Sequence, residues 1–391
     1  MKAALFGLAV AVLVSLSALA ADWHGSALRA GAPEGSDLPS TVFLTAACCA
    51  FGLYVAALFL VRRSRTRLAV VLAIAAAIQL VPLAGPLVIS RDVYAYWAYG
   101  RLAAVHDANP YTVAPSEFAG DPGSRAMAKG WRTSKSVYGP VFSAASAGLA
   151  ATGGRSPGNA ALAYRVAGAA GMLAVTALAA VVAPVPAFAA AFVGWNPLLA
   201  VDFAGGGHND VWMMAFVLGA LALATRRPRF AGASFAVAGG LKWVALGILP
   251  LWLLSSERRR ALRVAFGFAA AAVVVGGIAF YFFGTAWITA LGIFAHRTSD
   301  WAFPSRLHQL GLPRWLALVP LIALAPLLVR SARAGKPRMA LASMLLLVAT
   351  PWLLPWYAAW AVPLAAVEED RLVWVLALVF CAYILPDGVP L

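Results

Sequence analysis

Long apolar runs alternate with short polar segments along almost the whole chain. Several runs are about 18–23 residues long, which lets a helix cross ~30 Å of hydrocarbon. The clearest are Thr41–Val61, Leu68–Ile89, Ala160–Val182 and Arg263–Phe283. We therefore expect an all-α polytopic membrane protein with about eleven or twelve membrane elements, some of them half-length or re-entrant.

Composition supports this class and excludes a soluble one. Hydrophobic residues make up 62% of the chain and charged residues 12%, and the mean hydropathy is +0.82; soluble globular domains are far more polar. Cys48, Cys49 and Cys381 lie within apolar runs without metal-ligand spacing, so we expect them to be buried small hydrophobic residues.

The net charge of +15 comes mostly from arginine, and its placement indicates topology. Clusters at residues 62–67, 226–229, 258–263 and 330–338 each lie between apolar runs, which favours cytoplasmic anchors over nucleic-acid binding. The segment Met1–Ala21 reads either as a cleavable signal peptide or as a retained first span.

Two stretches do not fit simple crossings. If every run were a full span, His208 and the arginine cluster at 226–229 would both be cytoplasmic, so one element must be half-length or re-entrant. We assign that break to Trp195-Asn196-Pro197, because proline interrupts the helical hydrogen bonds. Phe230–Ser256 lies between two basic clusters and predicts a re-entrant hairpin with Lys242 at its tip.

The remaining hydrophilic residues gather in two loops that this topology places outside. Residues 90–137 form the first and longest, and residues 284–313 form the second. Loops as long as the first are commonly functional. No soluble domain and no clear repeat is evident, so residues 1–391 are read as a single transmembrane domain.

Asp92 is the central candidate for chemistry. It lies in the segment that begins at Ser90, directly after the apolar run that ends at Ile89, and it precedes several aromatic residues. If this segment is helical, Asp92, Tyr96 and Tyr99 share one face. A carboxylate there could take a proton from an acceptor hydroxyl. The alternative is an interfacial helix N-cap with tyrosines in the aromatic belt.

Lys242 and the Gly207-His208-Asn209-Asp210 motif are the next candidates. A lysine in an apolar hairpin requires an anionic partner, either a protein carboxylate or a lipid phosphate, unless it extends to the interface. His208 could donate to a phosphate or a hydroxyl, or the motif could be a polar loop in which Asp210 caps the next helix.

Basic residues of the second loop form a further candidate patch. Their charge suits a phosphate, although individual members could equally be simple surface charges. The four residues are His296, Arg297, Arg306 and His308.

Nucleotide-binding signatures are missing from the sequence. We find no Walker loop, dinucleotide fingerprint or nucleophile elbow in a suitable context. The energy for a transfer reaction would then come from the substrate itself, such as a sugar joined to a lipid phosphate.

Taken together, the motifs resemble a known family. The chain is similar to the polyprenyl-phosphate-mannose-dependent mannosyltransferases of actinobacterial type, within the GT-C superfamily, from about Ile89 to Trp360. The resemblance is carried, in order, by Arg91-Asp92 with Tyr94, Tyr96 and Gly100, then Asn109-Pro110-Tyr111, Tyr138-Gly139-Pro140, Trp195-Asn196-Pro197-Leu198, Gly207–Asp210, Lys242 and Pro355-Trp356-Tyr357.

The resemblance implies a GT-C-like fold, Asp92 as the catalytic base, inversion at the sugar, no required metal or other cofactor, and a site facing outward from the bacterial inner membrane. The donor would be a polyprenyl-phosphate sugar, with mannose expected and arabinose or glucose not excluded. The acceptor would be a glycolipid or glycan. A single carboxylate suffices for direct displacement.

We assign the remaining site residues to two groups within this hypothesis. Lys242, His208, Arg297 and His296 would bind the donor phosphate. The acceptor or sugar would contact Arg91, Tyr94, Tyr96, Tyr99, Asn109, Tyr111, Tyr138, Asn209, Asp210, Trp356 and Tyr357, with Trp97 helping to shape the cleft.

Two other classes remain open. A flippase or transporter of lipid-linked sugars would also use broken helices and an intramembrane lysine, but it has no need for a base in an external loop. A structural or assembly protein would explain the spans, but neither Lys242 nor the aromatic loop.

Overall fold

The structure is a computed structural model that describes residues 2–32, 37–64, 66–152, 154–293 and 297–390. Within these ranges the chain is built from helices, and its only pairing of extended backbone is an isolated bridge between Arg29 and Val88. The predicted all-α class is confirmed.

Five helical segments of the described chain are long and apolar enough to cross a membrane. They are α1 (Lys2–Asp22), α2 (Asp37–Arg63), α7 (Pro157–Val182), α13 (Arg258–Phe283), and η6 (Arg314–Leu318) continued by α16 (Val319–Arg333). The bent pair α8 (Pro186–Gly194) and α9 (Pro197–Ala200), with the π-helical turn η4 (Val201–Gly205), passes the same test as one element.

Shorter helices fill the space between these spans. The apolar ones are α3 (Leu68–Leu80) with η1 (Val81–Ala84), α10 (Asp210–Leu223), α12 (Ala245–Ser255), α17 (Met339–Ala349) and α19 (Arg371–Ile384). The others are α4 (Asp92–Val105), η2 (Pro115–Phe118), α5 (Pro122–Ala126), η3 (Lys129–Trp131), α6 (Pro140–Thr152), α11 (Pro228–Leu241), α14 (Ala286–Ile293), α15 (Phe303–Gln309), η7 (Pro355–Trp360) and α18 (Val362–Glu368).

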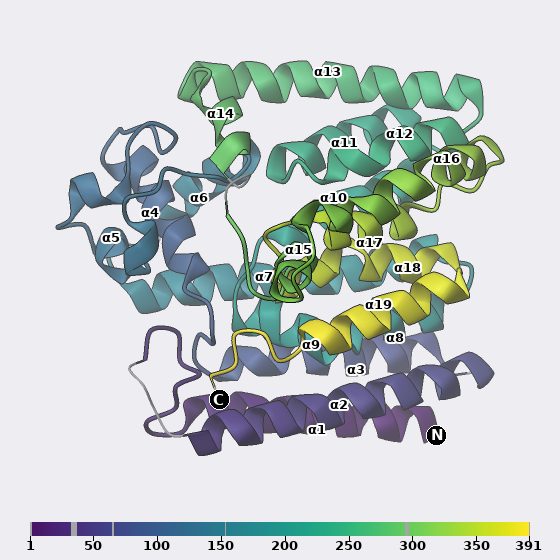
Figure 1. Ribbon diagram of the computed structural model, residues 1–391, viewed down its shortest axis with the longest axis horizontal. Coiled ribbons are helices and arrows are strands. Elements are labelled where there is room, and N and C mark those ends of the chain that lie inside the picture. Colours follow the sequence, from purple (N-terminus) through teal and green to yellow (C-terminus); the bar gives the residue numbers. More distant parts are fainter. Residues whose placement is uncertain (1, 33–36, 65, 153, 294–296, 391) are drawn as a thin grey trace.

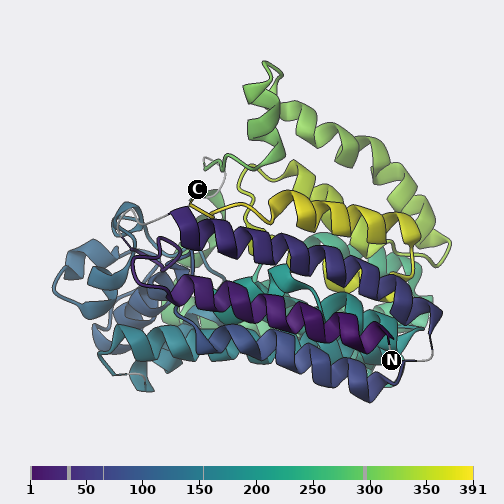
Figure 2. The ribbon, with the colours of Figure 1, turned by 90° about the horizontal axis from the view of Figure 1, so that it is seen from below.

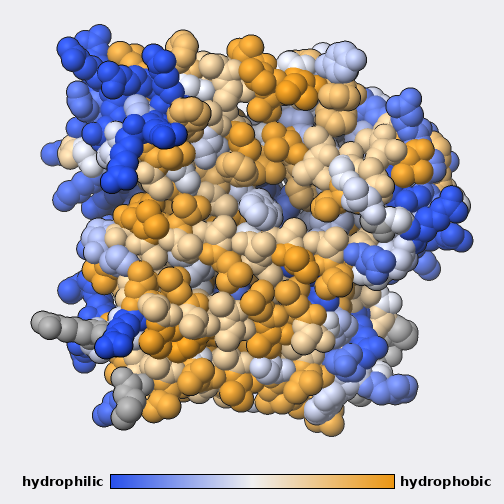
Figure 3. Space-filling view, turned by 180° about the vertical axis from the view of Figure 1, so that it is seen from behind, coloured by the Kyte–Doolittle hydropathy of each residue, from blue (hydrophilic) through white to orange (hydrophobic). Residues whose placement is uncertain are grey.

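The helices lie side by side and give the molecule two distinct ends (Figures 1 and 2). Helices α4, α5 and α6 gather at one end, which we call the Asp92 end. The α2–α3 and α12–α13 loops, which carry arginine clusters, lie at the opposite end (Figure 1). An apolar surface lies between two polar rims in the space-filling view (Figure 3), as expected for a bundle surrounded by hydrocarbon.

The predicted hairpin around Lys242 is confirmed as two short helices, α11 and α12. Gly232 packs against Val264 and Gly240 against Val275, so α11 runs in the same direction as α13. Helices α11 and α13 therefore start at the same end of the bundle. Because α12 ends just before α13 begins, α12 runs back to that end, in the direction opposite to α11. Lys242 lies in the break with extended backbone.

The predicted break at Asn196 is also confirmed, with a bend of 55° between α8 and the α9–η4 segment. Asn196 caps α9 by accepting the backbone N–H of Leu198 at 3.1 Å. The assignment of the half-length element to this break was nevertheless wrong. The bent pair begins at the arginine end, where the Arg62 guanidinium lies over the ring of Phe188. It ends at the Asp92 end, where the Gly205 carbonyl accepts the N–H of Val88. The pair therefore extends from one end of the bundle to the other.

Helix α6 is the half-length element instead. It begins beside the hairpin tip, where Gly139 lies against the carbonyl of Gly240. The loop that follows it returns to α4, where Arg101 donates to the Gly154 carbonyl at 3.2 Å. Both ends of α6 therefore lie at the Asp92 end. The helix packs on α4 and does not cross the bundle.

The cysteines differ in part from the expectation. Cys381 is buried, whereas Cys48 and Cys49 lie exposed on the outer surface of α2. Helix α1 packs into the bundle, since Gly7 lies against the ring of Trp195.

The contact between α11 and α13 yields a prediction about stability. A Cβ at Gly267 would lie 2.0 Å from the Arg229 carbonyl oxygen, whereas a Cβ at Gly276 meets nothing within 4 Å. Gly267→Ala should therefore cost about 1–3 kcal/mol through overpacking. The matched control Gly276→Ala should be neutral or stabilising. Thermal unfolding in detergent measures both, and equal melting temperatures would contradict the close packing.

Candidate active site

A cavity of about 380 Å³ opens at the Asp92 end of the bundle. It lies between the start of α4, the tip of the α11–α12 hairpin and the segment that leads into η7. Seven of the predicted site residues line it: Asp92, Tyr96, Tyr138, Asn209, Lys242, Trp356 and Tyr357. Its surface is mostly apolar and aromatic, with few polar groups, as is typical of small-molecule sites.

Asp92 is the first residue of α4, and its carboxylate faces this cavity. The helix N-cap is Arg91, whose side chain makes no capping hydrogen bond, and the Ser90 hydroxyl accepts the Asp92 backbone N–H at 3.2 Å, so the capping interpretation of Asp92 is not supported. The side chain is 31% exposed, and Oδ2 lies 3.8 Å from Nδ1 of His208. Burial raises the pKa of Asp92 to about 6, opposed in part by the positive charge of Lys242.

Lys242 is held by an ion pair from the hairpin tip to Asp210. Asp210 is completely buried at the start of α10, and its Oδ1 also accepts the Trp360 indole N–H at 2.5 Å. The ammonium lies 4.4 Å from the centroid of the Tyr357 ring and 5.2 Å from that of Trp360. Of the two anionic partners predicted for Lys242, the structure shows the protein carboxylate. Lys242 also lines the cavity.

His208 does not line this cavity with Lys242, contrary to the expected joint phosphate contact. Its imidazole is 1% exposed and stacks on Trp356, with ring centroids 3.4 Å apart at an angle of 11°. Nδ1 lies 3.4 Å from the Tyr96 hydroxyl. Burial lowers the pKa of His208, which favours the neutral imidazole. The contacts make it a support for Trp356 and for the region around Asp92.

Three predicted sugar-binding residues bind backbone carbonyl groups instead. Tyr99 donates its hydroxyl to the Ser134 carbonyl at 2.8 Å. Tyr111 donates to the Tyr138 carbonyl at 2.8 Å, and Asn109 donates to the carbonyl of Phe283, the last residue of α13, at 2.9 Å. None of the three lines the cavity, since their side chains donate to these carbonyl groups instead.

Arg91, Tyr94 and Trp97 also lie away from the cavity. Arg91 donates to the Ala126 carbonyl, and its guanidinium lies 5.8 Å over the ring of Tyr94. Trp97 is fully buried, with Arg101 packed over its ring. These side chains stabilise the start of α4 and the loop that follows it.

The predicted basic patch is only partly described. His296 lies outside the described residues. Arg297 lies 3.7 Å over the ring of Trp131, which lines the cavity. Arg306, in α15, lies over the ring of Trp301 and donates a hydrogen bond to Gln309. Neither Arg306 nor His308 lines the cavity. The patch therefore does not gather around one site.

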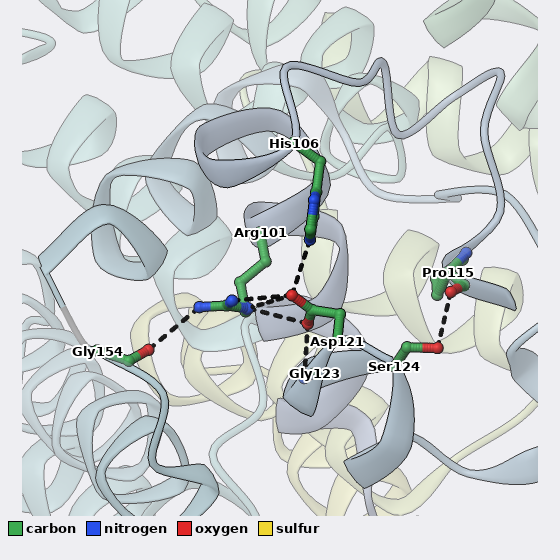
Figure 4. A network of polar contacts seen from close by, with 7 residues as sticks. All are labelled: Arg101, His106, Pro115, Asp121, Gly123, Ser124 and Gly154. Atoms are coloured by element: carbon green, nitrogen blue, oxygen red, sulfur yellow. Dashed lines mark hydrogen bonds and ion pairs between the residues drawn. The ribbon is translucent and has the colours of Figure 1, made fainter. Parts of the chain in front are cut away.

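A buried ion network, which the sequence analysis did not anticipate, fixes the shape of the first loop (Figure 4). Asp121 accepts from Arg101 Nη2 at 2.8 Å, from His106 Nε2 at 2.8 Å and from the Gly123 N–H at 2.7 Å. Burial acts to raise the pKa of Asp121, but the hydrogen bonds from Arg101 and His106 lower it to about 2. The Asp121 carboxylate therefore stays ionised throughout the physiological range.

Four tryptophans that line the cavity were not predicted either. Trp131 and Trp352 meet edge to face with ring centroids 6.1 Å apart. Trp243 follows Lys242, and Trp360 lies three residues after Tyr357. Trp243 and Trp360 lie close to motifs that the sequence analysis recognised, so this position in the sequence could have identified them as site residues. Among the described residues, no group of three or more His, Cys, Asp or Glu side chains is arranged to hold a metal.

Fold and cavity together define a polytopic helical membrane protein with an aromatic-lined site, carrying a few polar groups, at one end of its bundle. A family profile described as "Alpha-(1->6)-mannopyranosyltransferase, N-terminal domain" matches residues 4–290. The chain belongs to this family, which confirms the resemblance seen in its motifs.

A curated relative agrees with that assignment. The chain is 27% identical over 337 residues to Alpha-(1->6)-mannopyranosyltransferase A of Mycobacterium tuberculosis (strain ATCC 25618 / H37Rv). The match covers 71% of this chain and 61% of the relative, so the chain spans less than two thirds of the relative's length. No solved structure matches.

The ion pair of Lys242 yields a second prediction. Lys242→Met leaves the carboxylate of Asp210 buried without its countercharge and should cost about 3–5 kcal/mol of unfolding free energy. Adding Asp210→Asn removes the stranded charge, so the double variant should recover most of the lost melting temperature. A single variant as stable as the wild type would show that the pair does not hold the hairpin tip.

Proposed function

We propose that this protein is an inverting GT-C glycosyltransferase that transfers mannose from a polyprenyl-phosphate donor to a glycolipid or glycan. The observation that carries the proposal is that Asp92 and Lys242 face one aromatic-lined cavity. Membership of the family supports mannose as the sugar and an α-(1→6) linkage as the product.

Asp92 acts as the general base in this reaction. A carboxylate with a pKa near 6 is ionised at neutral pH and is a stronger base than an ordinary aspartate. It takes the proton of the acceptor hydroxyl as the oxygen attacks the anomeric carbon. Asp92 is the one carboxylate among the described residues lining the cavity, which suits direct displacement with inversion.

Lys242 stabilises the leaving group. As the new carbon–oxygen bond forms, the bond from the anomeric carbon to the phosphate oxygen breaks, and its electron pair leaves with the polyprenyl phosphate. The ammonium is already fixed by Asp210 and the ring of Tyr357, so it meets the developing charge without reorganising.

The remaining assignments follow from the same geometry. Aromatic walls, including Trp131, Trp352 and Trp356, offer apolar faces for sugar rings and for the first units of the prenyl chain. Arginine clusters at the opposite end favour a cytoplasmic location for that end. The cavity would then face outward from the bacterial inner membrane. The reaction needs no metal or other cofactor.

Replacing the base tests the proposal directly. Asp92→Asn should lower transfer from polyprenyl-phosphoryl-mannose to a mixed glycolipid and glycan pool by about 10²–10⁴-fold. Because the raised pKa means that the ionised carboxylate costs stability at neutral pH, the variant should not melt below the wild type. Asp370→Asn, at the exposed cap of α19, is the matched control and should transfer normally.

Three outcomes would contradict the proposal. Equal transfer by wild type and Asp92→Asn would remove Asp92 from the mechanism. Transfer by the wild type only from a nucleotide sugar would exclude the lipid donor. Absence of transfer together with scrambling of the lipid-linked sugar in proteoliposomes would favour a flippase.

The pH profile provides an independent measurement. Asp92 accepts a proton only when ionised, so kcat/KM should fall about tenfold per pH unit below pH ~6 and level off above it. Asp121 titrates near 2 and keeps the loop intact over this range. Initial rates between pH 5 and 8 test this, and a flat profile or a rise towards acid pH would exclude Asp92 as the base.

A further inference from the structure

A second cavity, of about 140 Å³, lies on the other side of Trp356 from the first. The two cavities share Trp356 and Leu354, but the second is lined by His208 and not by Lys242. Its walls come from α2, the segment before α4, the turn η4 and the segment after α19. It has room for a single sugar unit.

Asp202, in the π-helical turn η4, is the feature that marks this cavity as a site. Its side chain is 8% exposed, and Oδ2 has no hydrogen-bond partner among the described residues. An unpartnered buried carboxylate oxygen is costly, and packing alone gives no reason to keep it. Turns of this π type occur frequently at functional positions.

The charge around the cavity restricts what can bind there. Asp387 lines the cavity together with Asp202, and none of the described lining residues is a lysine or an arginine. A phosphate would meet two carboxylates and no cation. Neighbouring hydroxyl groups, in contrast, can form hydrogen bonds with the oxygens of both acids, while the face of Trp356 offers a stacking surface.

The backbone leading into Asp92 forms another wall. Ile89 has a φ of 60°, which is strained for a β-branched residue. The Leu28 carbonyl holds it by accepting its N–H at 2.8 Å. The Ser90 N–H donates to the Val88 carbonyl at 2.6 Å, and this hydrogen bond spans Ile89. The strained backbone positions Ser90 at the cavity, two residues before Asp92.

We propose that this second cavity is the subsite for the acceptor sugar, with Asp202 and Asp387 accepting hydrogen bonds from its hydroxyl groups. The proposal rests on the proposed transferase function. Inversion requires the acceptor and the leaving phosphate to occupy opposite faces of the anomeric carbon. The second cavity is lined by His208, whose Nδ1 lies 3.8 Å from Asp92 Oδ2, and not by Lys242, so it gives the acceptor its own approach to the base.

Asp202→Asn tests the subsite, because it keeps the shape of the side chain and replaces one carboxyl oxygen by an NH2 group, which cannot accept a hydrogen bond. The acceptor KM should rise roughly tenfold, as expected for the loss of one hydrogen bond to a buried group. The donor KM and the slow hydrolysis of the donor by water should stay unchanged. The melting temperature should stay level or rise, which a purely structural role for Asp202 would not give. Asp370→Asn is again the control.

Direct binding separates this inference from the proposed function. The probe is octyl α-(1→6)-mannobioside, titrated against wild type and Asp202→Asn without donor. Tenfold weaker binding to the variant supports the subsite even if the donor proves to be another lipid sugar. Equal affinities, no binding to the wild type at millimolar probe, a changed donor KM, or binding that requires an added divalent cation would each overturn the subsite.

Discussion

The ion pair between Lys242 and Asp210 is the interaction on which the site depends. It joins two places where the helical chain is interrupted, the tip of the α11–α12 hairpin and the start of α10. A single charge at either place would cost several kcal/mol, so the pair fixes one interruption against the other. The indole N–H of Trp360 donates to the same carboxylate oxygen and adds η7, a third distant segment, to the arrangement.

Asp92 is held in a different way, and the difference suits its proposed role. Tyr99 and Tyr111 fasten the first loop through backbone carbonyls, while the Arg101–Asp121 pair closes it from within. Helix α4 is thereby fixed without any direct ion partner for Asp92, whose carboxylate stays available at the cavity. One rigid frame therefore holds the Lys242 ammonium, paired with Asp210, near a free carboxylate, which is the preorganisation that the proposed charge-separating chemistry requires.

The sequence predicted the features that have local causes. Proline after Asn196 predicted one break, and the basic clusters on both sides of Phe230–Ser256 predicted the other, and both breaks exist. Features that depend on tertiary contacts were missed. Tyr96 and Tyr99 share a face of α4, yet only Tyr96 lines the cavity, because a loop carbonyl lies within reach of Tyr99. Helix α6 is apolar like a span, and only its packing on α4 distinguishes it.

Buried polar atoms without a hydrogen-bond partner occur at both ends of the described structure. At the arginine end, Glu368 accepts two backbone N–H groups at the start of α17, whereas Oε1 of the neighbouring Glu369 has no hydrogen-bond partner. At the Asp92 end, Asp202 and Asp210 each keep an Oδ2 without a partner among the described residues, and Ile89 keeps a strained φ. Asp202 lines the second cavity, whereas Asp210 lines neither of the two. Under the proposed function, a hydroxyl group of the substrate would supply the partner that Asp202 lacks, and its arrival would relieve a cost that the empty fold carries.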